Sequence, residues 1–272
     1  MTSSNPPELL AALLKHWRGK RGLSQLDLAN IADVSSRHIS FIETSRATPS
    51  AGMLRRLCAA LDVPLRHVNT MLEAAGHPAL YPDAGGPLPA EVSEVLGLLK
   101  AHHEPFPLVV LDRAYNVLDL NTGASALFSA ILPPAALAGH SAPNLARLTF
   151  DPNGAHPLLV NFDEVGRELL WRIQREVLAE PGEGSQRELL ADILAMPTVR
   201  ADWREPDLSI PSAPFIPVHL RIGDRELRFV TMVTVFQAPQ IVLLDELRIE
   251  TWLPSDTATA DACRELAAAS DA

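Results

Sequence analysis

Residues 36–40 place four side chains with hydrogen-bonding groups close together, namely Ser36, Arg37, His38 and Ser40. A guanidinium group such as that of Arg37 can donate two parallel hydrogen bonds to the edge of a guanine base. Serine hydroxyl groups and an imidazole ring can contact other base edges or phosphate oxygens. These residue types at this spacing predict a surface that binds nucleic acid, provided that a regular element presents them on one side.

Two short helices are predicted to present these side chains. The first follows Ser24, a typical N-cap residue, and the second follows a cap at Ser35 or Ser36 after a turn at Asp33-Val34. Their apolar positions recur at helical spacing, at Leu26, Leu28, Ala29 and Ile31 in the first helix and at Ile39 and Ile42 in the second. The small alanine lets the helices cross closely, and Val34 fills the turn. This pattern is typical of a helix-turn-helix, whose second helix enters the major groove of DNA.

Further residues at the flanks complete the predicted DNA interface. Gln25 at the start of the first helix and Arg46 just beyond the second suit contacts with phosphate groups. Phe41 has two interpretations, since it can contact a thymine methyl group or pack against the next helix. The complete set of predicted DNA-contacting residues is Gln25, Ser35, Ser36, Arg37, His38, Ser40, Phe41 and Arg46.

These two helices belong to a predicted bundle of five short helices in residues 1–76. An apolar series from Leu9 to Trp17 marks the first helix, Pro49-Ser50 begins the fourth and Pro64 begins the fifth. The stretch 77–90 is rich in proline and glycine and is predicted to be a linker. The N-terminal part is therefore expected to be an all-α domain.

Charge is divided unevenly between the two parts of the 272-residue chain. Up to Leu80 there are nine basic and six acidic residues, a net charge of +3. The rest of the chain has 14 basic and 27 acidic residues, a net charge of −13. A polyanion such as DNA is therefore attracted only by the N-terminal part.

Residues 91–272 are predicted to form an α+β domain, a sheet with helices on one face. A tight hairpin at 113–114 is predicted to join two strands, and a second hairpin turns at Gly223-Asp224. A closing helix is expected to begin at a Ser255 cap. The predicted strands are 106–112, 115–120, the two arms of 217–236, and an extended run at 241–254, and the predicted helices include 121–132, 162–180 and 185–196.

The stretch 227–236 is apolar on both faces of the predicted strand. A strand in a sheet with one solvated face would alternate apolar with polar residues. Both sides of this strand are therefore expected to be covered, whether by helices, by a ligand cavity or by a second subunit.

The segment "GLSQLDLANIADVSSRHISFIETSRATPS" resembles the Cro/repressor-type helix-turn-helix of the xenobiotic-response-element (XRE) family of bacterial regulators. The resemblance implies a lambda-repressor-like bundle. The family's motif residues match Gln25, Ala29, Val34, Ile39-Ser40 and Glu43. The sequence departs from the family at Ser45, where glycine is common, and at Phe41, where a polar residue is common, so the turn after the second helix is expected to differ.

Three later segments, "LVVLDRAYNVLDLNTGA", "NLARLTFDP" and "TVFQAPQIVLLDELRIETWLPSDTATA", are similar to the ligand-binding domain of the MmyB-like transcription regulators, which is PAS-like. The two resemblances together cover nearly the whole chain. They imply a transcriptional regulator with a small-molecule pocket, for which fatty-acid-like ligands have been suggested.

A pocket of this kind needs apolar walls and one or two polar anchors. Arg147 or His219 is expected to hold a carboxylate. The residues expected to form the walls are Phe128, Leu148, Trp171, Phe229 and Met232.

These patterns predict a homodimeric repressor that binds a quasi-palindromic operator with half-sites about 34 Å apart. Its operator affinity is expected to change when an apolar or fatty-acid-like effector binds, and no cofactor is expected. In the alternative hypothesis, the C-terminal domain serves only for dimerisation or for docking a protein partner and binds no ligand.

Other classes of protein are not indicated. No apolar run approaches the roughly 20 residues that cross a bilayer, and "MTSSNPPELL" does not have the pattern of an export signal, so a cytoplasmic protein is expected. Cys58 and Cys263 are predicted to be buried thiols, with neither a disulfide nor a metal site. No catalytic arrangement is recognised, and the chain is not expected to be an enzyme.

Overall fold

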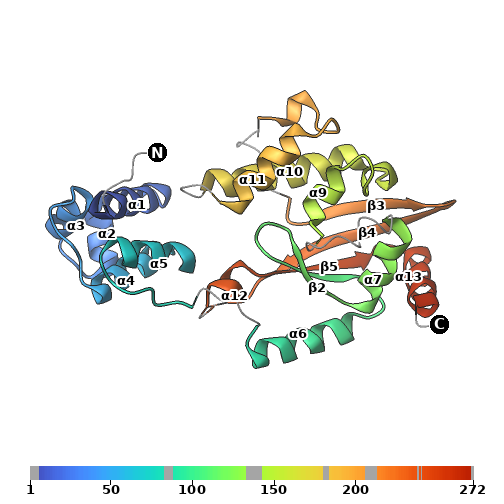
Figure 1. The fold of residues 1–272 in the computed structure, drawn as a ribbon, viewed down its shortest axis with the longest axis horizontal. Coiled ribbons are helices and arrows are strands. Elements are labelled where there is room, and N and C mark those ends of the chain that lie inside the picture. Colours follow the sequence, from blue (N-terminus) through green and yellow to red (C-terminus); the bar gives the residue numbers. More distant parts are fainter. Residues whose placement is uncertain are drawn as a thin grey trace. The chain divides into compact units, whose positions relative to one another are not determined.

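The chain folds into two compact units, shown in the computed structural model of Figure 1. The structure describes residues 6–82, 88–132, 143–179, 184–205, 213–237, 239 and 241–270. The first unit contains Met1–Pro87 and Gln237–Asp245, and the second contains Leu88–Phe236 and Glu246–Ala272. Part of the predicted linker, residues 83–87, lies outside the described residues.

The first unit contains the five helices of the predicted bundle. They are α1 (Pro6–Lys20), α2 (Gln25–Ala32), α3 (Ser36–Glu43), α4 (Ala51–Ala60) and α5 (Leu65–Ala74). Ser24, Ser35 and Ser50 cap α2, α3 and α4, because each hydroxyl accepts a hydrogen bond from a first-turn N–H that has no partner in the helix. The core includes Leu14, Trp17, Leu28, Ile39, Ile42, Leu54, Leu57 and Met71. Since Ile39 and Ile42 point into this core, the other side of α3 faces outward.

The second unit contains a five-stranded sheet in the order β2-β1-β5-β4-β3, and all neighbouring strands are antiparallel. The strands are β1 (Leu108–Leu111), β2 (Val117–Leu120), β3 (Ile216–Ile222), β4 (Arg225–Thr234) and β5 (Arg248–Pro254). The α+β class predicted from the sequence is therefore confirmed.

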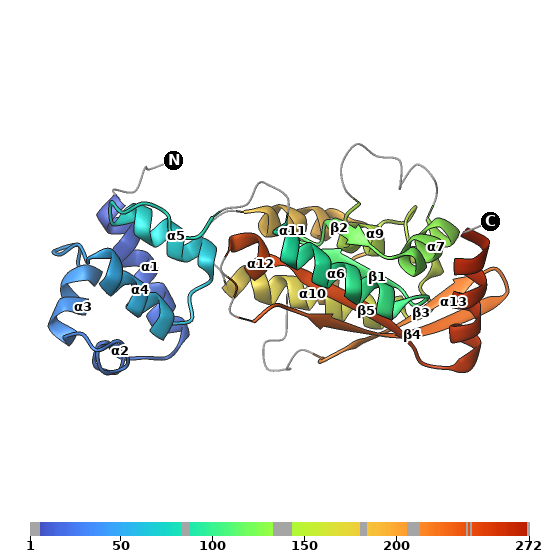
Figure 2. The ribbon, with the colours of Figure 1, turned by 90° about the horizontal axis from the view of Figure 1, so that it is seen from below.

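Helices cover both faces of this sheet, with α6 on one side and α10 and α11 on the other (Figures 1 and 2). The helical segments of this unit are α6 (Ala90–His103), α7 (Thr122–Ile131), α9 (Leu145–Phe150), η1 (His156–Leu158), α10 (Phe162–Ala179), α11 (Ser185–Ala195), η2 (Ala201–Trp203) and α13 (Thr257–Ser270). The remaining helix, α12 (Val242–Glu246), belongs to the first unit except for its last residue. On β1, Val109 and Leu111 enter the large core, whereas Leu108 and Val110 pack with Leu96 of α6. The prediction of helices on one face only was wrong, because β1 is apolar on both sides and each side is buried.

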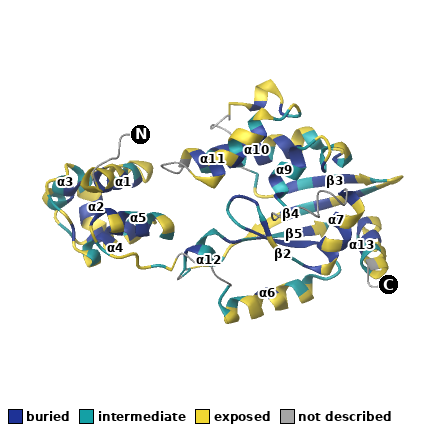
Figure 3. Cartoon of the chain, viewed as in Figure 1, coloured by how far each residue is buried: buried dark blue, intermediate teal, exposed yellow. Residues whose placement is uncertain are grey.

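Strand β4 is covered on both sides only in part. Leu227, Phe229 and Thr231 are buried, but Met232 is 48% exposed and Val233 is 40% exposed. Figure 3 shows the same change from buried to exposed along β4. A single chain therefore does not cover both faces of β4 at its end, and cover of this end by a second subunit, one of the predicted alternatives, stays a prediction.

The first hairpin is wider than predicted. β1 ends at Leu111 and β2 begins at Val117, because the Asp112 carboxylate accepts hydrogen bonds from the backbone and side-chain N–H groups of Asn116 and closes a longer loop. Tyr115 in this loop has a φ of +64°, in the left-handed region that non-glycine residues rarely adopt.

Two predictions near the C-terminal end were also wrong. The run 241–254 is not one extended segment: it begins with α12, whose Val242 is fully buried, and only Arg248–Pro254 is a strand. The closing helix is capped by Asp256, whose carboxylate accepts a hydrogen bond from the Thr259 N–H at 2.7 Å. Ser255 is not this cap, because it lies two residues before the first helical residue, Thr257, and its hydroxyl instead donates to the carbonyl oxygen of Arg228.

Candidate DNA interface and ligand cavity

The outward side of α3 carries the side chains that were predicted to contact bases. Arg37 is exposed, whereas Ser36, His38 and Ser40 are half-buried. The Arg37 guanidinium lies 5.2 Å from the centre of the Phe41 ring, a cation–π contact. The Phe41 ring therefore packs against the Arg37 side chain, and this contact limits the directions in which the Arg37 guanidinium can point.

The residues at the two ends of α3 are placed by its caps. The Ser35 hydroxyl accepts a hydrogen bond from the His38 N–H, so Ser35 is the cap and Ser36 is the first helical residue. At the other end Ser45 has a φ of +57°, the conformation that glycine adopts most easily. The backbone N–H of Arg46 then donates to the carbonyl oxygen of Phe41 at 2.7 Å, and the Arg46 side chain is exposed.

Gln25 belongs to a half-buried polar network that joins three helices. Its amide donates to Glu43 at 2.7 Å, and Glu43 also accepts hydrogen bonds from Arg18 at 2.6 and 2.9 Å. Burial alone would raise the pKa of Glu43, but the hydrogen bonds from Arg18 and Gln25 and the charges of Arg18 and Lys15 lower it below its ordinary value. The network fixes α3 relative to α1 and α2, and Gln25 contributes to it through the amide group predicted to contact phosphate.

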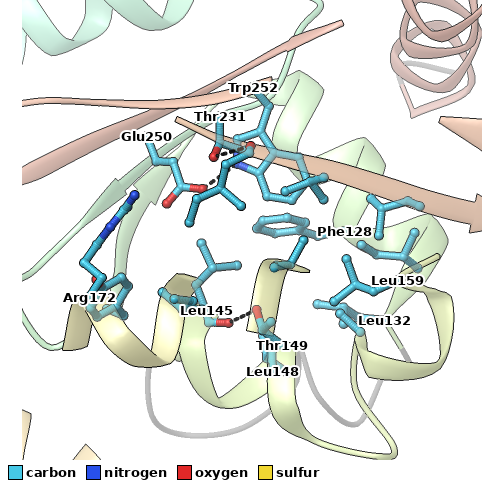
Figure 4. Close-up of a pocket in the computed structure, with 18 residues that line it drawn as sticks. Phe128, Leu132, Leu145, Leu148, Thr149, Leu159, Arg172, Thr231, Glu250 and Trp252 are labelled. Atoms are coloured by element: carbon cyan, nitrogen blue, oxygen red, sulfur yellow. Dashed lines mark hydrogen bonds between the residues drawn. The ribbon is translucent and has the colours of Figure 1, made fainter. Parts of the chain in front are cut away.

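The second unit encloses an apolar cavity of about 60 Å³ between the sheet and helices α7, α9 and α10 (Figure 4). Its walls come from the sheet and from the helices on one face of it. The apolar lining residues include Phe128, Ile131, Leu132, Leu145, Leu148, Leu159, Val165, Leu169, Ile216, Val218, Leu220 and Trp252. Residues that are far apart in the sequence therefore meet around one apolar space.

A polar pocket of about 330 Å³ adjoins this cavity. The two share the lining residues Tyr115, Arg172, Thr231 and Glu250. Figure 4 shows Arg172 and Glu250 together at one end of the cavity, away from Leu132 and Leu159. The combined site is therefore apolar at one end and carries ionisable groups at the other.

The acidic and basic groups of the polar end affect one another. Trp252 donates its indole N–H to Glu250 at 2.9 Å, and Arg248 forms an ion pair with Glu176 at 3.1 Å. Burial raises the pKa of Glu250, although the positive charges of Arg172 and Arg248 and the hydrogen bond from Trp252 act in the opposite direction. Arg172 and Arg248 thus share this end with the two carboxyl groups of Glu176 and Glu250.

The hydroxyl of Tyr115 lies at the junction of the two spaces. The side chain is buried, and the hydroxyl oxygen makes no hydrogen bond of ordinary geometry within the described part of the chain. Arg248 lies over the Tyr115 ring at 5.1 Å. Buried polar groups are normally hydrogen-bonded, so this hydroxyl is a suitable partner for a polar group of a bound molecule.

The structure brings only two of the predicted ligand residues, Phe128 and Leu148, to the cavity wall. The two predicted anchors lie elsewhere: Arg147 pairs with Asp192 at 2.5 Å, and the ring of His219 is 4.0 Å from Glu226.

The other three predicted wall residues are also outside the cavity lining. Trp171 lies between Arg167 and Arg175, and Phe229 is buried behind the lining, against Trp252. Met232 is exposed.

The polar lining residues that sequence reasoning missed include Arg172, Thr231 and Glu250. One signal was visible, since Glu250 and Trp252 alternate along β5 and must therefore lie on the same face. An acidic residue beside a tryptophan on a buried strand face is unusual and indicates a polar site within the core.

Comparisons with known protein families cover most of the chain. Residues 9–71 match a helix-turn-helix domain. Residues 92–266 match the MmyB-like transcription regulator ligand binding domain. No curated protein matches the sequence.

A comparison with solved structures found an RNA-binding light-oxygen-voltage receptor that is 12% identical, with a TM-score of 0.24. The match covers 98% of the present chain, which spans 64% of the length of that receptor chain. Among the described residues, no helix is long and apolar enough to cross a membrane, and no three His, Cys, Asp or Glu side chains form a cluster that could hold a metal ion.

Proposed function

The chain belongs to the MmyB-like transcription regulators, and we propose that it is a homodimeric repressor whose DNA affinity is set by an apolar small molecule bound in the second unit. The observation that carries the ligand part of this proposal is a largely apolar cavity, at one end of which Arg172, Thr231 and Glu250 meet. Ligand sites in proteins commonly combine apolar walls with a few convergent polar groups in this way.

The chemistry of the cavity favours an elongated apolar ligand with one acidic group, such as a fatty acid. Its apolar part would contact Phe128, Leu148 and Trp252, and its acidic group would lie near the Arg172 guanidinium and the Tyr115 hydroxyl. A carboxylate suits this end because charge-assisted hydrogen bonds from arginine are strong. Arg172 thus takes the role that the sequence analysis assigned to Arg147 or His219.

The ligand would have to enlarge the apolar cavity. Small-molecule sites usually enclose roughly 300–1,000 Å³, whereas the apolar cavity measures about 60 Å³. Ligand entry therefore requires displacement of lining side chains or of the elements that carry them, and part of the ligand would occupy the adjoining pocket. This requirement provides a physical link between ligand binding and a change of conformation.

The DNA part of the proposal is supported by α3. Its exposed Arg37 is limited in direction by Phe41, and its inner residues fix the helix in the core. We assign base contacts to Ser36, Arg37, His38 and Ser40 and backbone contacts to Arg46. A homodimer would place two copies of α3 in successive major grooves of a quasi-palindromic operator, about 34 Å apart.

A second candidate function for the second unit is dimerisation or protein docking without a ligand. It is favoured by the small volume of the apolar cavity and by the exposed apolar side chains Val95, Leu98 and Leu99 on α6. Exposed apolar side chains grouped on one element often mark an interface.

Native mass spectrometry of freshly purified protein tests these proposals, with the denatured mass as a reference. A dimer that carries an added small-molecule mass per chain would support ligand control. A dimer without added mass that also fails to bind saturated fatty acids would support the second candidate function. Selection of bound sequences from random DNA would supply the operator for affinity measurements.

A further inference from the structure

The connection between β4 and β5 is unusually long for neighbouring antiparallel strands. β4 ends at Thr234 and β5 begins at Arg248, whereas such strands are commonly joined by roughly two to five residues. The connection contains its own helix, α12, and an apolar run at 241–244. Long connections with ordered structure often have a function.

Residues 237–245 of this connection pack within the first unit, although both flanking strands belong to the second. Val242 is fully buried, and its N–H donates to the carbonyl oxygen of Pro82 at 3.2 Å. The Asp245 carboxylate accepts a hydrogen bond from the N–H of Leu65 at 2.9 Å. Leu65 is the first residue of α5, and its predecessor Pro64 provides no side-chain cap. Asp245 therefore caps α5 from 180 residues away in sequence.

The same helix also holds the segment that ends at Pro82. Asn69 of α5 is buried, and its side-chain oxygen accepts hydrogen bonds from the N–H groups of Leu80 and Tyr81, both at 3.0 Å. Its amide donates to the carbonyl oxygen of Tyr81 at 2.6 Å. Helix α5, residues 80–82 and residues 242–245 thus form one hydrogen-bonded cluster, which we call the α5 clamp.

The strands that lead into and out of the α5 clamp also line the cavity. Thr231 lies on β4, eleven residues before Val242, and Glu250 lies on β5, five residues after Asp245. Within the first unit α5 packs against α1, and α1 packs against α3. A displacement of β4 and β5 by a ligand therefore has a continuous route along the chain and through packed helices to the DNA-contacting helix.

From these contacts we propose that the α5 clamp transmits the ligand state of the cavity to the DNA-binding unit. The proposal rests on the proposed ligand control, and it adds the element through which that control acts. Ligand entry would shift β4 and β5, alter the hold of residues 242–245 on α5, and so change the placement of α3. Position along a route does not establish coupling, so the test must measure coupling itself.

Val242→Ser tests the proposal, with Val235→Ser as its matched control. The two substitutions are chemically identical and lie in the same connection, but Val242 is fully buried whereas Val235 is 58% exposed. Operator affinity is measured with and without dodecanoate, and dodecanoate binding is measured separately by calorimetry. Coupling between two sites typically changes affinity about 5- to 150-fold.

We expect dodecanoate to change the operator affinity of wild-type protein and of Val235→Ser by a similar factor of at least about five. In Val242→Ser this factor should fall towards one, although the protein still binds both operator and dodecanoate. Full retention of the factor in Val242→Ser would overturn the role of the α5 clamp.

Amide hydrogen exchange tests the contacts of the α5 clamp without any ligand. It therefore separates failure of the clamp proposal from failure of the proposed ligand control. Val242→Ser should accelerate exchange at Leu65 and in the first turn of α5, whereas Val235→Ser should not. Asp245→Ala should accelerate exchange at the same amides, since it removes the acceptor of the Leu65 N–H. If dodecanoate does not change the operator affinity of the wild-type protein, the proposed control by a fatty acid fails for this probe. The role of the α5 clamp is overturned separately if amide exchange in α5 is unchanged in Val242→Ser.

Discussion

Arg37 is the side chain on which base recognition by α3 depends in our proposal. Arg37→Ala should weaken binding to the selected operator by about 1–3 kcal/mol, because it removes a bidentate contact with a base. Operator affinity is measured by fluorescence anisotropy at fixed salt concentration. Unchanged affinity would remove Arg37 from the interface.

Arg46→Ala is the comparison for this prediction, because Arg46 is assigned to the DNA backbone. It should weaken binding to all sequences nearly equally and should reduce the slope of log affinity against log salt by about one. A loss confined to one base position of the operator would show that Arg46 contacts a base instead.

Glu43 gives a second prediction at the residue scale. Because its pKa is lower in the folded chain than the ordinary value of 4.5, its ionised carboxylate stabilises the fold above that value, and the stabilisation is lost as the pH falls through the lowered pKa. Glu43→Gln should cost about 2 kcal/mol at pH 7, since it weakens hydrogen bonds from Arg18 and Gln25. The free energy of opening of α2, followed by amide exchange from pH 7 to 4, should also depend less on pH in the variant. If Glu43→Gln lost the same amount of stability at every pH, the proposed role of the ionised carboxylate would be contradicted.

Glu250 is expected to show the opposite dependence on pH. Burial raises its pKa, so the folded chain binds this proton more tightly than the unfolded chain. Between the ordinary value of 4.5 and the raised pKa, the second unit should therefore lose stability as the pH rises, by at most about 1.4 kcal/mol per pH unit. Glu250→Gln removes this dependence and keeps an oxygen to accept the Trp252 N–H. Urea unfolding of the wild-type protein and of Glu250→Gln between pH 5 and 8 tests this prediction. The same dependence of unfolding free energy on pH in both proteins would contradict it.

At the scale of elements, the helix-turn-helix could be predicted in detail because its signals are local. Ser24 caps α2 as expected, and the apolar spacing identified Leu28 and Ala29 of α2 and both isoleucines of α3 as buried. Leu26 and Ile31 belong to the same predicted pattern but are 60% and 57% exposed. The hairpin at Gly223 and the helix after Asn121 follow equally local patterns. Such features depend on residues a few positions apart, so their physics is visible in a short stretch of sequence.

The cavity could not be predicted in the same way because its walls depend on tertiary packing. Arg147 on α9 and Arg172 on α10 have the same side chain, and only the packing of these two helices decides which one faces the cavity. The N-terminal cap that Asp245 provides to α5 likewise joins residues that are too far apart in the sequence for any periodic pattern to predict. The predicted anchors were chosen by residue type, and the structure places both outside the cavity lining, Arg147 in an ion pair with Asp192 and His219 beside Glu226.

Helix α6 allows a prediction about the covered face of the sheet. Leu96 is 2% exposed and packs on β1, whereas Leu98 on the same helix is 56% exposed. Leu96→Ala should destabilise the second unit by about 2–5 kcal/mol, and Leu98→Ala should change the stability of a monomer by less than about 0.5 kcal/mol. Urea unfolding and analytical ultracentrifugation separate the two effects. A loss of dimer in Leu98→Ala would instead assign the exposed side of α6 to the subunit interface.

At the scale of the whole molecule, the division of charge agrees with the division of roles. The positive N-terminal part carries α3, and the acidic remainder carries the cavity. The acidic part weakens non-specific attraction to DNA, so binding should depend strongly on the contacts made by α3. In a regulator of this kind, a small change in the placement of α3 can alter operator affinity substantially.

The final prediction separates ligand control from the alternative in which the second unit binds no ligand. Ala155 lines the apolar cavity, so Ala155→Phe should fill its space, while Ala268→Phe adds the same ring at an exposed position of α13. Ala155→Phe should lose any added mass in native mass spectrometry and should bind operator with an affinity that dodecanoate no longer changes. Ala268→Phe should behave like the wild-type protein.

Because overpacking can cost about 1–3 kcal/mol, the smaller change Ala155→Leu serves as a second variant, and thermal unfolding identifies variants that fail to fold. A folded Ala155→Phe protein whose operator affinity still responds to dodecanoate would place the effector site outside this cavity. A wild-type dimer without ligand, whose operator affinity is indifferent to dodecanoate and to both substitutions at Ala155, would favour a second unit that only dimerises or docks a protein. Ligand control and a ligand-free second unit therefore predict different effects of Ala155 substitutions on the response of operator affinity to dodecanoate. Ala155 can distinguish them because it lies in the second unit, outside α3.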